Sequence, residues 1–66
     1  MKQEIVVNDI TFKIGDDVFI EEMKGEPIYK QKTGKILSID DLGQIHGTWG
    51  GCALVPDIDK FRKIEK

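Results

Sequence analysis

His46 is the one side chain in this 66-residue chain whose ordinary pKa lies near neutrality, so acid–base chemistry would have to use it. Asp40 and Asp41 stand a few residues before it, on the far side of a turn signal. A histidine–carboxylate pair across that turn would suit a small enzyme. A hydrogen bond that holds the turn is the favoured interpretation, and catalysis by His46 is the least favoured function.

Cys52 is the only cysteine, and it would act as a nucleophile only beside a base. It follows a Gly-Gly turn and leads a short apolar run, so a small buried thiol is the favoured interpretation. One cysteine and one histidine are fewer than the ligands that zinc requires. The sequence therefore predicts no metal site and no cofactor.

Tyr29 and Trp49 are the two aromatic residues that could together form a shallow groove for a partner. Gly47 and the following glycine pair favour this, because missing side chains would expose the tryptophan face. Packing of both rings in or around the core is the slightly favoured alternative, since a small barrel needs large side chains to close it. The candidate partner-binding residues are Tyr29, His46, Trp49, Gly50 and Gly51.

A cluster of lysines is the basis for an alternative function, nucleic-acid binding. Its members lie within one twelve-residue stretch: Lys24, Lys30, Lys32 and Lys35. Three glutamates nearby dilute the field, and the whole chain has a net charge of -2 and a pI near 5.2. Because phosphate-backbone binding usually needs a basic footprint, a solvated loop is the favoured interpretation.

The elements that must position these residues are short β-strands. Residues 4–7 and 10–13 flank Asn8-Asp9, a pair that tolerates positive φ, and this predicts a hairpin. Residues 17–23 form the next strand, with Val18 and Ile20 on the core face. A long connection, 24–33, follows, and Ile28 and Tyr29 are expected to fold back from it onto the core.

The second half of the chain continues in the same way. A strand at 34–39 with a bulge leads through a turn at 40–43 to a strand at 44–49. A Gly-Gly turn then precedes a short strand at 52–55, a 3₁₀ turn at 56–60 and a last strand at 61–64. This order predicts an all-β fold, an SH3-like barrel of about five strands over 15–64, with an added hairpin at 1–14 in one domain, 1–66.

The composition bounds the remaining possibilities. A lone thiol excludes an internal disulfide, which favours the cytoplasm, and the first ten residues lack an apolar run of signal-peptide length. No stretch approaches the roughly 18 apolar residues of a membrane span. A homodimer that pairs through an exposed edge strand or the hairpin is compatible with enzymatic, protein-binding and nucleic-acid-binding functions alike.

The motif Gly43-Gln44-Ile45-His46-x-x-Trp49, followed by Leu54-Val55-Pro56-x-Ile58-Asp59, resembles a family of small bacterial and phage-borne proteins of unknown function. The resemblance covers residues 15 to 64. It implies an SH3-like barrel and a bacterial or mobile-element source, and it implies no activity and no functional residue. Gly47 and the short turn at Gly50-Gly51 depart from the family pattern.

These observations together predict a non-enzymatic module that binds a protein partner through the Tyr29 and Trp49 face. The absence of a catalytic set, the acidic balance and the cluster of aromatics with glycines support this hypothesis. The partner itself is not identified by any motif.

Overall fold

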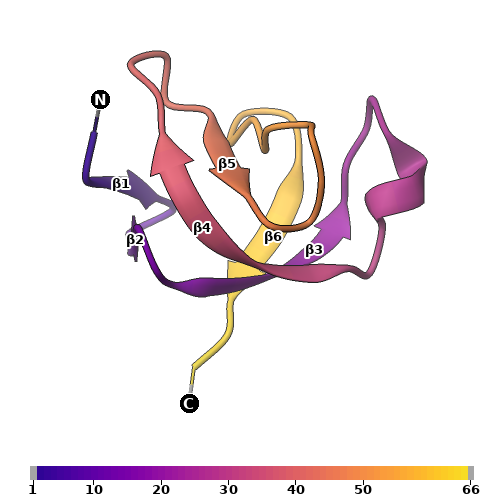
Figure 1. The fold of residues 1–66 in the computed structure, drawn as a ribbon, viewed down its shortest axis with the longest axis horizontal. Coiled ribbons are helices and arrows are strands. Elements are labelled where there is room, and N and C mark those ends of the chain that lie inside the picture. Colours follow the sequence, from indigo (N-terminus) through magenta and orange to yellow (C-terminus); the bar gives the residue numbers. More distant parts are fainter. Residues whose placement is uncertain (1, 66) are drawn as a thin grey trace.

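In the computed structural model, which describes residues 2–65, six strands form two antiparallel sheets (Figure 1). The strands are β1 (Glu4–Val7), β2 (Ile10–Lys13), β3 (Asp17–Glu22), β4 (Thr33–Ile39), β5 (Ile45–Gly47) and β6 (Lys60–Lys63). A 3₁₀ helix, η1 (Pro27–Tyr29), lies between β3 and β4. The all-β prediction is confirmed. Met1 and Lys66, the ends of the predicted domain, lie outside the described residues.

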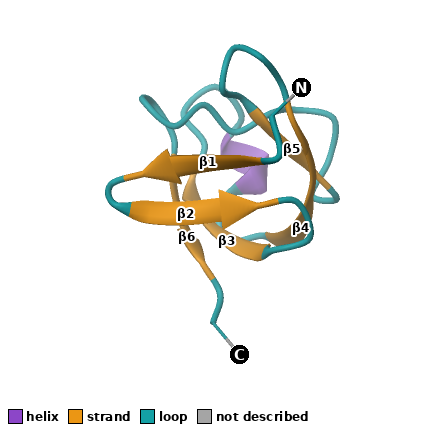
Figure 2. Cartoon of the chain, turned by 90° about the vertical axis from the view of Figure 1, so that its left-hand side faces the viewer, coloured by secondary structure: helices purple, strands orange, loops and turns teal. Residues whose placement is uncertain are grey.

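The hairpin of β1 and β2 forms as predicted. Asn8 and Asp9 both have positive φ, 51° and 67°, as a tight two-residue hairpin turn requires. The two strands lie across one side of the larger sheet (Figure 2). They bring Phe12, which is only 2% exposed, against Phe61 with ring centroids 5.2 Å apart. The hairpin therefore closes one side of the core.

The larger sheet has the strand order β5-β4-β3-β6. The predicted bulge in β4 is present as a register shift between Ile36 and Ser38, and it lets both Ile36 and Ile39 point into the core. A second shift, in β3 between Ile20 and Glu22, turns Met23 inward although alternation predicts an outward side chain. The buried apolar side chains are Phe12, Val18, Ile20, Met23, Ile36, Ile39, Ile45, Trp49 and Leu54.

The predicted strand at 52–55 is reduced to one bridge, so the five-strand detail of the prediction is not reproduced. Leu54 exchanges two backbone hydrogen bonds with Ile45, of 2.9 and 2.7 Å. Pro56 lacks an N–H group and cannot extend the ladder. The predicted strand at 44–49 is likewise shorter, because only Ile45–Gly47 pairs with β4.

The predicted 3₁₀ turn at 56–60 is present as a turn, but its hydrogen bonds are not purely of the 3₁₀ type. The Val55 carbonyl accepts hydrogen bonds from both Ile58 and Asp59, at 2.9 and 2.8 Å, so the turn mixes two spacings. The 3₁₀ helix lies instead in the long connection, where it begins at Pro27. Ile28 does not fold back onto the core, since it is 70% exposed, and Tyr29 alone does so.

Candidate functional site

Trp49 is packed inside the molecule, not displayed on it. It is 6% exposed, and its indole N–H donates a 2.7 Å hydrogen bond to the Cys52 carbonyl. A Cβ placed on Gly47 would lie 2.2 Å from the indole ring, and one on Gly34 would lie 2.8 Å from it. These glycines make room for the chain's own tryptophan. The predicted use of Trp49 as an exposed groove wall is therefore wrong.

Tyr29 is half-buried and fills the space that Gly50 leaves. A Cβ at Gly50 would come within 2.4 Å of the phenol ring, and the φ of +158° is extended backbone. The ammonium group of Lys32 lies 5.5 Å from the ring centroid. Gly51 is exposed, with open space where a side chain would stand. The structure thus brings Tyr29 and Gly50 together, but as packing partners.

His46 and Asp40 form the predicted pair across the turn. The Nε2 atom of His46 lies 3.1 Å from Oδ2 of Asp40, and both side chains are partly exposed. The other carboxylate oxygen accepts the backbone N–H groups of Leu42 and Gln44 at 2.9 and 3.0 Å. Both carboxylate oxygens of Asp40 therefore hydrogen-bond within the turn region, which is the structural role that the sequence favoured.

This arrangement lowers the pKa of the Asp40 carboxyl group below its ordinary value. The hydrogen bond from His46 contributes most, followed by the backbone N–H of Gln44. Partial burial acts in the opposite direction and is outweighed. The carboxylate is consequently held in its charged form, which suits an acceptor in a turn better than a general acid.

The four lysines do not converge on one surface as unpaired charges. Lys35 lies 3.3 Å from Asp17 and also donates to the Gly15 carbonyl, and Lys32 stands over Tyr29. Lys24 and Lys30 line a shallow hollow that they share with Glu22. The placement of these lysines does not favour nucleic-acid binding over a solvated loop.

In the part of the chain that the structure describes, no cluster of side chains is suited to bind a metal ion or to activate the thiol of Cys52. Residues 2–65 hold no set of three or more His, Cys, Asp or Glu side chains placed to bind a metal ion. Cys52 is half-buried, and its backbone carbonyl oxygen, not its thiol, accepts the hydrogen bond from the Trp49 indole. Over the same residues, no helix is long and apolar enough to cross a membrane.

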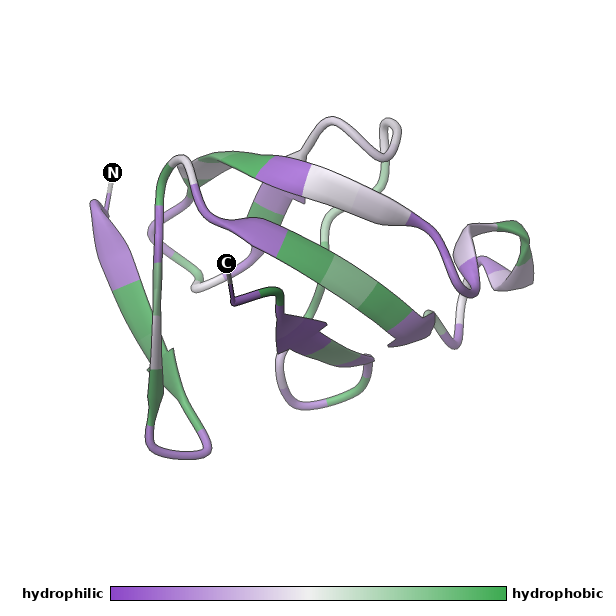
Figure 3. Ribbon diagram, turned by 90° about the horizontal axis from the view of Figure 1, so that it is seen from below, coloured by the Kyte–Doolittle hydropathy of each residue, from purple (hydrophilic) through white to green (hydrophobic). Residues whose placement is uncertain are grey.

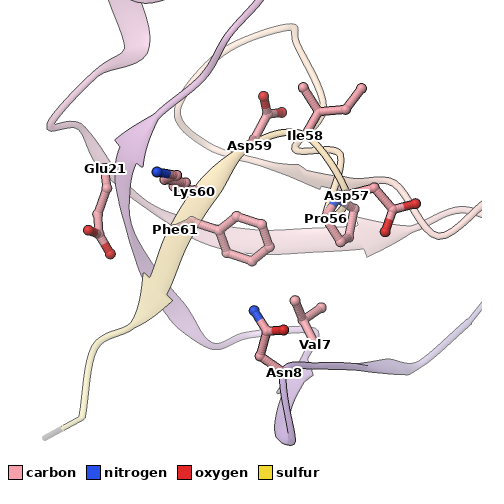
Figure 4. Close-up of a pocket in the computed structure, with 9 residues that line it drawn as sticks. All are labelled: Val7, Asn8, Glu21, Pro56, Asp57, Ile58, Asp59, Lys60 and Phe61. Carbon is pink, nitrogen blue, oxygen red and sulfur yellow. The ribbon is translucent and has the colours of Figure 1, made fainter.

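A hollow of about 410 Å³ lies along β6, between the tip of the hairpin and the turn that precedes β6 (Figure 4). We call it the β6 hollow; it is lined by Val7, Asn8, Glu21, Pro56, Asp57, Ile58, Asp59, Lys60 and Phe61. Phe61 points toward Val7 and Pro56, and these three side chains form an apolar floor for the β6 hollow. Glu21 and Asp57 place exposed carboxylates on its rim.

Asp59 belongs to the wall of the β6 hollow and not to its chemistry. Its side chain is buried, and its two oxygens accept the backbone N–H groups of Lys24 at 3.1 Å and Val55 at 2.9 Å. The bond from Lys24 ties the turn before β6 to the segment that follows β3, and the bond from Val55 closes the turn itself. Asp59 therefore holds one wall of the hollow in place.

β6 is the terminal strand of its sheet, and its outer edge borders the β6 hollow. Ile64 donates a 2.9 Å backbone hydrogen bond to the Asp17 carbonyl. Hydrogen-bonded pairs recur at every second residue of an antiparallel ladder. The backbone N–H and C=O groups of Arg62 therefore point toward β3, whereas those of Phe61 and Lys63 point away from β3. Within residues 2–65, those outward groups have no main-chain partner.

The sequence did not indicate this location. Val7 is far in the chain from Pro56 and Phe61, and only the packing of the hairpin brings it to them. The available signal was the alternation in residues 60–63, where one aromatic stands among basic residues. That pattern predicts an edge strand, since lysines are common on exposed sheet edges.

No protein-family model, curated protein or solved structure matches this chain. The resemblance carried by the Gly43 to Trp49 motif, and the bacterial or mobile-element source that it implies, stay predictions.

Proposed function

We propose that this protein is a non-enzymatic interaction module that binds a protein partner at the β6 hollow. The observation that carries the proposal is the coincidence, at Phe61, of a hollow that has an apolar floor with an open strand edge. Each feature alone is common on small proteins. Together they offer a partner both a place for a side chain and main-chain groups to bind.

The proposal moves the partner site away from Trp49 and Tyr29 and keeps the predicted class of function. A cytoplasmic setting, and service to a phage or other mobile element, are parts of the same proposal. The His46 and Asp40 pair takes a structural role in it, because Asp40 is engaged by two backbone N–H groups as well as by the imidazole.

Two exposed isoleucines allow a matched test. Ile58 lines the β6 hollow and is 53% exposed, whereas Ile28 is 70% exposed on η1. A random ten-residue peptide display library is selected against the wild-type protein. Ile58→Asp is expected to weaken binding of the selected peptides about tenfold or more, because a carboxylate then replaces an apolar side chain in the lining of the hollow. Ile28→Asp is expected to leave binding unchanged.

The pair of variants also distinguishes the alternative surface. Both substitutions lie on the exterior, so circular dichroism should show the wild-type fold for each. Loss of binding in Ile28→Asp alone would move the site to the Tyr29 loop. Equal binding by both variants, or a library that yields no binder, would overturn the proposal.

A further inference from the structure

β6 carries its side chains on two different surfaces. Phe61 and Lys63 face the hairpin, where the Lys63 ammonium lies 3.3 Å from the Thr11 carbonyl and 3.4 Å from Asp16. Lys60 and Arg62 alternate with them and face the other side of the sheet. Figure 3 shows the result as a mainly hydrophilic strand leading to the C-terminus. Any strand added beside β6 would meet these two surfaces in alternation.

The basic side chains of β6 disfavour pairing with a second copy of the chain. An antiparallel pair that aligned Phe61 with its own copy would place Lys60 opposite Arg62. A shift by one hydrogen-bonding step would place Arg62 opposite Arg62. Like charges directly opposite each other destabilise a strand pair. The β6 edge is therefore open to a different partner, and its basic side chains disfavour pairing with β6 of a second copy.

The charges also fix what a partner strand must carry. Arg62 lies over the Phe19 ring, 4.9 Å from its centroid, and is exposed. A residue directly opposite Arg62 would share its side of the sheet, where a carboxylate is favoured. A residue opposite Phe61 would share the side of the β6 hollow, where an apolar side chain is favoured. Glu21 and Asp57 on the rim disfavour a second acidic residue at the Lys60 end.

We propose that β6 binds an extended segment of another protein as an added strand, with an apolar residue opposite Phe61 and an acidic residue opposite Arg62. This inference rests on the proposed function and specifies the partner chemistry of the same site. The backbone N–H and C=O groups of Phe61 and Lys63 would supply the main-chain hydrogen bonds, and the two side-chain positions would supply specificity.

Charge reversal is the first test, with the peptides selected from the random ten-residue library as the probe. The wild-type protein is expected to select an acidic residue next to an apolar one. Arg62→Glu is expected to weaken those peptides about tenfold and, in a new selection, to replace the acidic residue by Lys or Arg. Lys30→Glu is the matched control, because it makes the same charge change on an exposed loop residue.

Backbone methylation is the second test. N-methylation of the peptide residue opposite Phe61 removes an N–H that strand addition requires and is expected to abolish binding. N-methylation of the next residue, opposite Arg62, blocks an N–H that points away from β6 and is expected to be tolerated. Equal effects of the two methyl groups would overturn strand addition.

The two proposals fail in different ways. Peptides that depend on Ile58 but tolerate both methyl groups, or ignore Arg62→Glu, would overturn the strand inference and leave the module a binder of another geometry. Peptides that ignore Ile58 altogether would overturn the proposed function itself, as would a library without binders. A dimer in sedimentation velocity that Arg62→Glu strengthens would show that β6 pairs with itself, against the inference.

Discussion

Three glycines lie directly against aromatic rings, and this contact explains much of the chain's glycine use. Gly34 and Gly47 border the indole of Trp49, and Gly50 borders the ring of Tyr29. The sequence shows the aromatic residues and the glycines, but not that the glycines leave room for the rings. These contacts join residues up to 21 positions apart, as for Gly50 and Tyr29. A pattern that looked like an exposed face is in fact close packing.

Gly47→Ala is expected to destabilise the protein by about 1–3 kcal/mol, because its new methyl group would overlap the Trp49 ring. Gly51→Ala is the matched control, since nothing lies within 4 Å of the position where its methyl group would stand. Urea denaturation followed by tryptophan fluorescence measures both. Equal midpoints for the two variants would contradict the packing described for Trp49.

Asp40 should make stability depend on pH in the acid range. The pKa of its carboxyl group is lowered in the folded protein from its ordinary value of 3.8, so the stability it contributes is fully present above that unfolded-state pKa. That contribution is lost as the pH falls through the lowered folded-state pKa. Asp40→Asn keeps an oxygen for the turn but loses this dependence. Its difference in unfolding free energy from the wild type should shrink between pH 5 and pH 2 (about the range in which such carboxyls titrate), and a constant difference would contradict the pair.

The N-terminal hairpin contributes the buried ring of Phe12 to the core. Local chemistry was sufficient to predict the hairpin, because an alternating run on each side of Asn8-Asp9 specifies a turn and two strands. Its role in the core was not predictable in the same way. Phe12 reaches Phe61 across 49 positions of sequence, and only the packed structure shows that contact.

Phe12→Ala is expected to cost about 3–5 kcal/mol, because the ring is almost fully buried and its loss leaves a cavity beside Phe61. For a chain this small, that is most of the available stability. Val6→Ala, on the exposed side of the same hairpin, should change it by less than about 0.5 kcal/mol. Thermal unfolding measures both, and a wild-type midpoint for Phe12→Ala would mean that the hairpin is not part of the core.

The strand at 52–55 and the 3₁₀ turn after it show where local patterns stop being sufficient. Both segments have the expected composition, yet Leu54 pairs at one position only, and the Val55 carbonyl is shared by two donors. Buried Asp59 decides the geometry, because its oxygens must be satisfied by backbone groups from two separate segments. The bond from Lys24 joins residues 35 positions apart, and such a long-range polar contact leaves no local signature in the sequence.

At the scale of the whole molecule, the arrangement leaves the β6 edge of the larger sheet open beside a hollow with an apolar floor. The hairpin covers the core from one side, and the turn before β6 frames the other, so the edge at Phe61 lies between two fixed walls. The net charge of the chain argues against nucleic-acid binding, but it does not indicate the β6 hollow. The location depends on which strand ends the sheet, and that is a property of topology.

Amide hydrogen exchange of β6 tests the central claim most directly. In the free protein, the amides of Phe61 and Lys63 are expected to exchange quickly, whereas the Arg62 amide, which faces β3, is expected to exchange slowly. On saturation with a library-selected peptide, Phe61 and Lys63 should become protected while Arg62 changes little. Protection of Phe61 and Lys63 already in the free protein, or unchanged exchange in the complex, would contradict the account.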